Sequence, residues 1–121
     1  MIFIGIDWST QHDDICIIDN QGQVIKEFRI PVSATGFSKL LQVLKETEPN
    51  PEEICFGIET DKNILADFLL AAGYQVYSLN PLSVNRFKER YTTSGKKDDK
   101  FDAFNIASIL VTDRDHFKPI C

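Results

Sequence analysis

The chain has 121 residues, of which 43% are hydrophobic and 26% charged, and its formal net charge is −5. This length and composition are those of one soluble globular domain, while the acidic balance argues mildly against a free-standing nucleic-acid binder. No apolar run approaches the roughly 20 residues of a membrane span, and Met1 leads into strand-like sequence without a basic signal-peptide region. We expect a single cytoplasmic domain over residues 1–121 that does not bind a membrane.

The hydrophobic pattern predicts strands first and then alternating helices and strands. Residues 2–8 are apolar on both faces, as in a central strand, and Asn20-Gln21-Gly22 is a turn signal between two further strands. In chain order we expect strands at 13–19 and 22–30, a helix from Ser33 or Thr35 to about 48, a strand at 54–59, a helix at 62–72, a strand at 74–79, a short helix at 81–90, a polar loop at 91–98 and a helix from 99 to about 110. This order predicts an α/β fold of the ribonuclease-H-like class, with a mixed five-stranded sheet and helices on both faces.

Four carboxylates stand where a metal site would need them. Asp7 and Glu59 each come at the end of an apolar run, and Asp99 and Asp102 are three residues apart at the start of a helical pattern. Acids at buried strand ends are costly unless a charge compensates them, and carboxylate oxygens are the ligands that Mg²⁺ prefers. Each acid also has a structural interpretation, as a turn or cap residue, but those interpretations do not explain all four together.

Basic side chains are concentrated near the end of the chain. Residues 1–80 hold 5 basic and 12 acidic side chains, whereas residues 81–121 hold 8 basic and 6 acidic ones. The cluster consists of Arg86, Lys88, Arg90, Lys96, Lys97 and Lys100. It predicts a phosphate-binding surface, with Tyr91 as a residue that could stack on a base; a solvated helix and loop is the alternative.

Other residue types carry weaker signals. The cysteines show no paired spacing, and Cys16 and Cys55 lie in apolar strands, which predicts buried thiols in a reducing compartment. His12 and His116 are isolated and are interpreted as surface or structural residues. We place Trp8 in the core, with a contact to a base or sugar as the alternative.

Three motifs in order resemble the DEDD transposases of bacterial insertion sequences, the IS one-ten and IS eleven-eleven group, whose N-terminal domain is similar to the RuvC Holliday-junction resolvase. They are Gly5-Ile6-Asp7-Trp8-Ser9, Gly57-Ile58-Glu59-Thr60 and Lys97-Asp98-Asp99-Lys100-Phe101-Asp102-Ala103. The resemblance spans about residues 2–120. It implies that Asp7, Glu59, Asp99 and Asp102 are the catalytic and metal-binding acids, with Mg²⁺ as the cofactor and Mn²⁺ able to substitute. Asp98 stands where the family usually has Thr, and because it is four residues from Asp102 it is an alternative candidate to Asp99 for the third ligand.

The resemblance also implies partners. They are DNA, both as transposon ends and as target, and a guide RNA. A C-terminal domain of the same chain would carry a serine nucleophile. The full-length protein is expected to form a homo-oligomer. The chain stops at Cys121, before such a domain, so we interpret it as an N-terminal fragment that is inactive alone. The implied function is metal-dependent phosphodiester cleavage and strand transfer in transposition.

Three alternatives remain at this stage. The first is a self-contained RuvC-like resolvase or nuclease, and the second is a non-catalytic interaction domain of the same fold. The third is an actin-like ATPase-type domain, because Gly5–Thr10 also resembles the first phosphate loop of those proteins. Metal-dependent DNA cleavage separates the nucleases from the interaction domain, and ATP binding would single out the ATPase.

Overall fold

The computed structural model describes residues 1–60, 62–79 and 99–120, and within these it leaves the side chains of residues 99–102, 116 and 118 undescribed. The elements are β1 (Ile2–Trp8), β2 (His12–Ile18), β3 (Val24–Pro31), α1 (Ala34–Thr47), the 3₁₀ turn η1 (Pro51–Glu53), β4 (Ile54–Ile58), α2 (Ile64–Ala71), β5 (Gln75–Ser78), α4 (Asp99–Asp113), the 3₁₀ turn η2 (Arg114–His116) and β6 (Lys118–Pro119). The predicted helix at 81–90 and loop at 91–98 lie outside the described residues.

The strands form one mixed sheet in the order β3-β2-β1-β4-β5-β6. β1 pairs antiparallel with β2 and parallel with β4, so it is central, as its two-sided apolar sequence predicts. The ribonuclease-H-like α/β class is confirmed. The sheet has one strand more than predicted, because the two-residue β6 pairs antiparallel with β5 at the edge.

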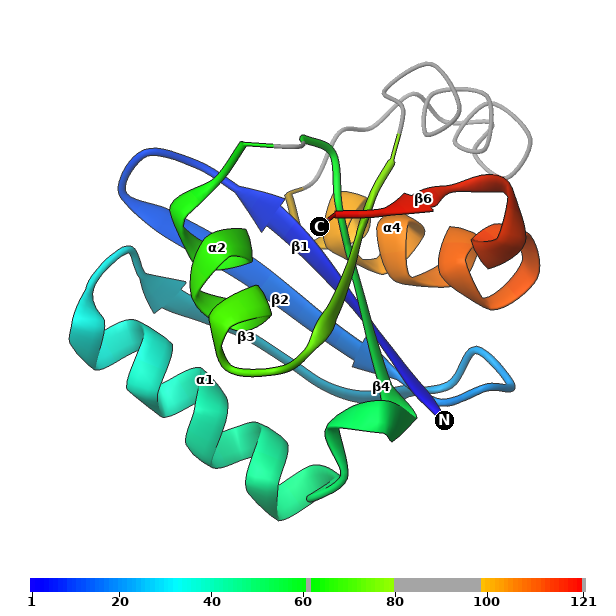
Figure 1. Ribbon diagram of the computed structural model, residues 1–121, viewed down its shortest axis with the longest axis horizontal. Helices are drawn as coiled ribbons and strands as arrows, with labels where there is room; N and C mark the ends of the chain where they lie inside the picture. The colour runs from blue at the N-terminus through cyan, green and yellow to red at the C-terminus, as the bar shows by residue number, and fades with distance from the viewer. Residues whose placement is uncertain (61, 80–98, 121) are drawn as a thin grey trace.

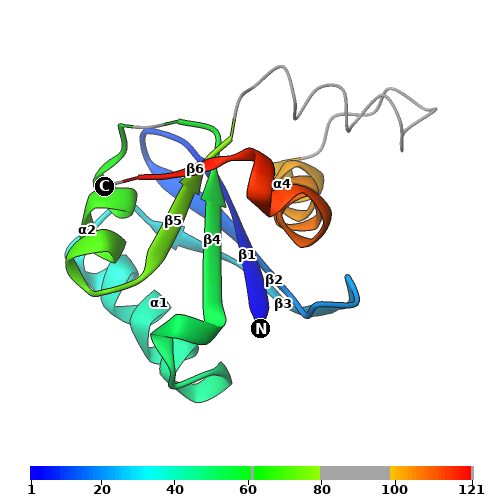
Figure 2. The same ribbon diagram turned by 45° about the vertical axis from the view of Figure 1, so that its right-hand side comes forward.

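Helices cover both faces of the sheet (Figure 1). α1 and α2 lie on one face and α4 lies on the other, which Figure 2 shows nearly edge-on. One core includes Ile4, Ile6, Phe56 and Ile58 under α1 and α2. The second, smaller core includes Phe3, Cys16 and Cys55 under α4. Along β1 and β4, alternate residues therefore belong to opposite cores.

Local signals fix the helix ends. The Ser33 side chain accepts a hydrogen bond from the backbone N–H of Gly36 at the start of α1, and Asn63 caps α2 in the same way through Leu65 and Ala66. Gly73 adopts a positive φ of 95° directly after α2, a conformation that glycine tolerates at a helix end. Within the described residues no helix is long and apolar enough to cross a membrane.

Trp8 and Ile64 are large apolar residues that are exposed, and one of them, Trp8, was predicted to lie in the core. Trp8, the last residue of β1, is 42% exposed and does not belong to the core under α1 and α2, so the prediction of a core tryptophan is wrong. Ile64 is 63% exposed because it opens α2 on the side away from the sheet. Cys16 and Cys55 are free and buried, as predicted.

Candidate metal centre at the carboxyl edge of the sheet

The parallel pairing of β1 and β4 places Asp7 and Glu59 at neighbouring positions. Ile6 is the register partner of Ile58, so the next residue on each strand is an acid. Adjacent strands are about 4.8 Å apart, and both acids are half-buried. The two carboxylates therefore belong to one edge of the sheet, the edge at which β1 and β4 end.

The strand alternation assigns both acids to the face that α4 covers. Phe3 and Cys55 pack in the core under α4. Since successive side chains alternate between faces, Asp7 follows Phe3 and Gly5 on that face, and Glu59 follows Cys55 and Gly57.

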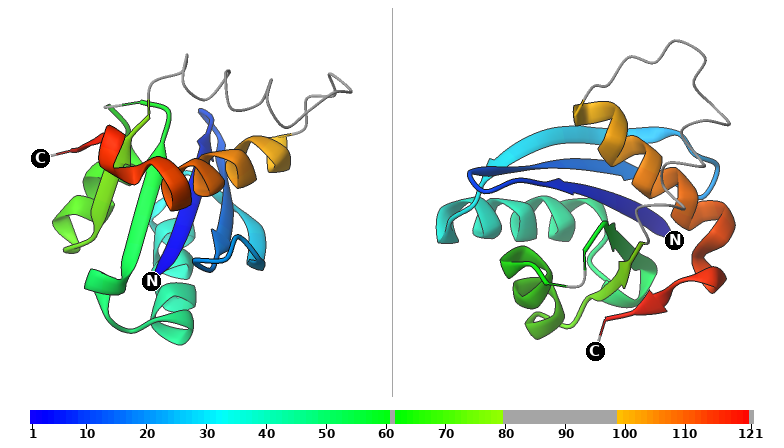
Figure 3. Two further views of the ribbon diagram at one scale, coloured as in Figure 1. Left: turned by 90° about the vertical axis from the view of Figure 1, so that its right-hand side faces the viewer. Right: turned by 90° about the horizontal axis from the view of Figure 1, so that it is seen from above.

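Two glycines let α4 lie directly on the sheet. A Cβ atom added at Gly5 would overlap the carbonyl oxygen of Ala103 and lie 2.7 Å from the backbone nitrogen of Ala107. A Cβ atom at Gly57 would lie 2.7 Å from a methyl group of Leu110. Figure 3 (left) shows α4 crossing β1 and β4. The helix backbone thus touches β1 two residues before Asp7.

The first turn of α4 carries the other two candidate acids. The helix begins at Asp99, and Asp102 immediately precedes the Ala103 that contacts Gly5. Residues three apart share one helix face, so the two positions lie together near the end of β1. Asp98 and Tyr91 lie outside the described residues, as do all the basic cluster residues except Lys100, whose side chain is undescribed.

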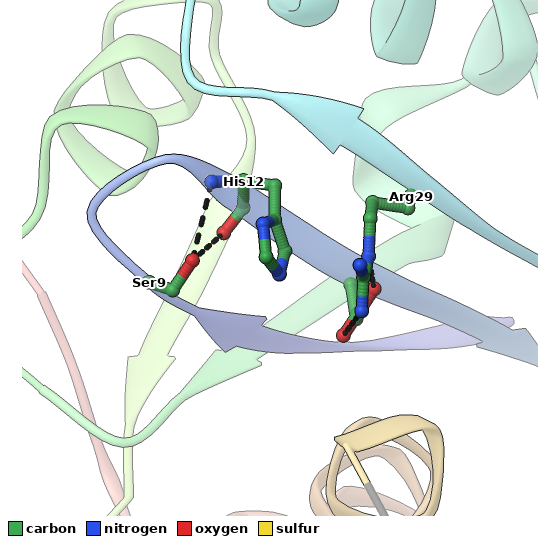
Figure 4. A network of polar contacts seen from close by, with 4 residues as sticks. Ser9, His12 and Arg29 are labelled. Carbon is green, nitrogen blue, oxygen red and sulfur yellow. Dashed lines mark hydrogen bonds and ion pairs between the residues drawn. The ribbon is translucent and has the colours of Figure 1, made fainter.

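A fifth acid, which we did not predict, lies in the same row. Asp14 on β2 is the register partner of Asp7 and is 4% exposed. The guanidinium of Arg29 on β3 donates two hydrogen bonds to its carboxylate, of 2.7 Å from Nε and 3.1 Å from Nη2. Figure 4 shows this ion pair at Arg29 beside the turn that joins β1 and β2. The pair compensates the charge of one acid beside Asp7.

That turn is closed by Ser9 and His12. The Ser9 hydroxyl donates to the carbonyl oxygen of His12 at 2.5 Å and accepts from the His12 backbone N–H at 3.1 Å (Figure 4). His12 is half-buried, in agreement with a structural role. By fixing the turn, these bonds help to hold β1 and β2 in the register that sets Asp14 opposite Asp7.

The neighbouring Asp13 points to the other face. It is 1% exposed, and neither of its carboxylate oxygens has a hydrogen-bond partner among the described residues. Burial is the main reason that the pKa of Asp13 is raised from 3.8 to about 6; the nearby Ser9 backbone amide and His12 oppose the rise, and the Asp14 charge adds a small contribution to it. Asp13 is a buried acid behind the candidate site and faces away from it.

The donor set at the edge suits a hard divalent cation. Asp7 and Glu59 supply carboxylate oxygens from adjacent strand ends, and such oxygens are the ligands of Mg²⁺ and Mn²⁺. No group of three His, Cys, Asp or Glu residues that could hold a metal ion occurs among the described side chains, which do not include those of Asp99 and Asp102. The described part of the site therefore offers two carboxylates to a cation, and the other two predicted ligands, Asp99 and Asp102, have undescribed side chains.

Comparisons with known proteins agree with this architecture. The family model for DEDD transposases of the IS110 type, described as a transposase, matches residues 4–120. The chain belongs to this family. It is 35% identical over 120 residues to a protein named for the mini-circle transposase of IS117 in Streptomyces coelicolor, and 31% identical over 113 residues to a protein named as transposase y4uE in Sinorhizobium fredii.

These alignments cover 98% and 92% of this chain but 29% and 32% of the two relatives, so the chain spans about a third of their length. Among solved structures, RuvC of T. thermophilus in complex with a Holliday junction substrate superposes with a TM-score of 0.67. That match covers 98% of this chain and 99% of RuvC at 15% sequence identity, and it shows a shared fold. The sequence motifs thus pointed to the family that the comparisons show.

Proposed function

We propose that this chain is the catalytic domain of an insertion-sequence transposase and that Asp7, Glu59, Asp99 and Asp102 form its metal centre. One observation carries the proposal. Asp7 and Glu59 occupy neighbouring parallel strand ends on the face where the backbone of α4 contacts Gly5, one residue after Asp102. The reaction class is DNA phosphodiester cleavage and strand transfer.

Each element has a role in this proposal. Asp7 and Glu59 hold the cation from the sheet, and the first turn of α4 adds Asp99 and Asp102 from above. Bound Mg²⁺ or Mn²⁺ would polarise the scissile phosphate and stabilise the leaving oxygen. We choose Asp99 as the third acid because it lies three residues before Asp102 on one face of α4, whereas Asp98 lies outside the described residues.

The proposal also extends to a longer protein that contains this domain. The chain spans about a third of its curated relatives, and we assign the serine nucleophile, the guide RNA and the homo-oligomer to such a longer protein. DNA is the proposed substrate. The basic cluster at residues 86–100 is its proposed contact surface, because positive side chains attract phosphates. Residues 1–121 alone are then expected to cut DNA poorly.

The metal centre is tested by thermal unfolding with and without Mg²⁺. A cation that binds the folded form raises the melting temperature. Asp7→Asn and Glu59→Gln should each abolish that rise, while Asp67→Asn, which removes an exposed acid from α2, should leave it intact. A rise of equal size in all three variants would place the cation elsewhere and refute the proposed centre.

A self-contained resolvase is the second candidate. It is favoured by the structural match to RuvC, which covers almost the whole of both chains. Incubation of the 121-residue chain with a four-way DNA junction and Mg²⁺ separates the two. Efficient cleavage that Asp7→Asn abolishes would favour the resolvase, with water as the nucleophile, whereas cleavage that appears only when the remaining part of a relative is joined to the chain would favour the transposase.

A further inference from the structure

The row of acids at the carboxyl edge continues onto β2. Asp14 is the register partner of Asp7 in the antiparallel pair of β1 and β2. Side chains of such partners point to the same face, with Cβ atoms about 4.5–5.5 Å apart. Cys16 and Ile18, the next residues on that face of β2, pack in the core under α4. Asp14 is therefore directly beside Asp7 on the face of the proposed metal centre.

Asp14 is held in place more tightly than a surface acid. Its side chain is 6% exposed, and the Arg29 guanidinium binds it through two hydrogen bonds, of 2.7 and 3.1 Å. The two residues are also register partners across β2 and β3. A planar guanidinium that binds both carboxylate oxygens fixes the carboxylate plane as well as its position.

This arrangement leaves Asp14 able to accept further hydrogen bonds. A carboxylate offers about four lone-pair sites, and the Arg29 fork occupies two of them. The charge of Asp14 is compensated by Arg29, so it adds less repulsion beside Asp7 than a bare carboxylate would. Outer groups that hydrogen-bond to the ligands of a metal ion orient those ligands. Asp14, an oriented acceptor next to Asp7, is placed for this role.

We propose that Asp14 is a positioning residue of the metal centre: fixed by Arg29, it accepts hydrogen bonds from the water shell of the cation held at Asp7. The proposal rests on the metal centre of the proposed function. Arg29 acts through Asp14, as the group that sets its orientation. The row on this face is then Glu59 and Asp7 as ligands, Asp14 as the outer acceptor and Arg29 as its support.

The test measures Mg²⁺ affinity of the 121-residue chain by calorimetry, well below the melting temperature of each variant. Asp14→Asn should weaken the affinity about 10- to 100-fold. Arg29→Lys keeps the positive charge but loses the fork, so it should also weaken the affinity, by a smaller factor. Glu27→Gln is the matched control, because Glu27 is an exposed acid on the same face of β3, two residues farther from the edge. It should bind Mg²⁺ like the wild type.

A purely structural role for the pair predicts a lower melting temperature without a change in affinity, and that result would overturn the proposal. If Asp14→Asn does not fold, the double variant Asp14→Asn with Arg29→Gln carries the test, because it removes both members of the ion pair. Wild-type affinity in the double variant would overturn the proposal, and weakened affinity would support it. Asp7→Asn distinguishes the metal centre from the role of Asp14. If Asp7→Asn abolishes Mg²⁺ binding and Asp14→Asn does not change it, the metal centre is supported and only the role of Asp14 is refuted.

Discussion

Protonation of the buried Asp13 should control a measurable part of the stability of this domain. Its side chain is 1% exposed, and its register partners are Trp8 on β1 and Ile30 on β3. Neither carboxylate oxygen has a hydrogen-bond partner among the described residues. The charged form is therefore poorly solvated, and the fold favours the protonated acid.

The size of the effect follows from the pKa of Asp13, which burial raises from 3.8 to about 6. Because the folded chain binds this proton more tightly than the unfolded chain does, the stabilisation is fully present below about pH 3.8 and is lost as the pH rises through about 6. A shift of about 2 pKa units corresponds to about 3 kcal/mol of unfolding free energy. That is a large share of the stability of a small domain.

Urea unfolding of the wild type and of Asp13→Asn at about pH 4 and about pH 7.5 tests this reasoning. The variant does not titrate at this position, so between the two pH values it should gain about 2.5 kcal/mol relative to the wild type, because at about pH 4 the unfolded wild type is already partly protonated. The comparison is repeated in a His12→Gln background, because His12 contributes to the electrostatic environment of Asp13. A stability difference that stays constant with pH would refute the reasoning.

Three further measurements follow from the structure. Gly5→Ala should lower the unfolding free energy by about 1–3 kcal/mol and weaken Mg²⁺ binding, because the new methyl group would overlap the α4 backbone. Gly57→Ala would meet the side chains of Leu110 and Ile106 rather than the helix backbone and should cost less, so equal losses would contradict the steric argument. The pKa of the Cys16 and Cys55 thiols is raised to about 12 by burial, so mass spectrometry should find them unlabelled by a thiol reagent in the folded chain and labelled in urea. Acrylamide should readily quench the fluorescence of Trp8, the only tryptophan, which is 42% exposed; strong protection would contradict its position.

The sequence predicted the positions of the main strands and helices well, but it did not predict which apolar residues at their ends are exposed. Residues 2–8 form β1 as predicted, because a strand that is apolar on both faces has few alternatives. Trp8 and Ile64 continue the apolar pattern but are exposed, since periodicity identifies a face and says nothing of how far a helix covers it. β6 was missed because two residues carry no period.

Part of the candidate site could likewise be predicted from the sequence, and part of it could not. Asp7 and Glu59 could be identified because each ends an apolar run, and the parallel register of β1 and β4 makes them neighbours. The Asp14–Arg29 pair, fifteen residues apart in sequence, could not be, because it depends on the register of β2 and β3. That register shifts between Ile17 and Ile18, and a shift of one residue moves a side chain to the other face. The catalytic roles of all four acids remain predictions.

The contact of Gly5 with Ala103 has a consequence for how related chains can diverge. These two positions belong to the first and the last of the three motifs, ninety-eight residues apart, yet they share one small volume. A larger residue at position 5 would have to be accompanied by an outward shift of the helix, which would carry Asp102 away from Asp7. Among related chains, a larger side chain at position 5 is therefore expected to accompany a longer distance between these two acids. A search for distant relatives would gain selectivity by requiring a glycine two residues before the first acid and a small residue directly after the last one.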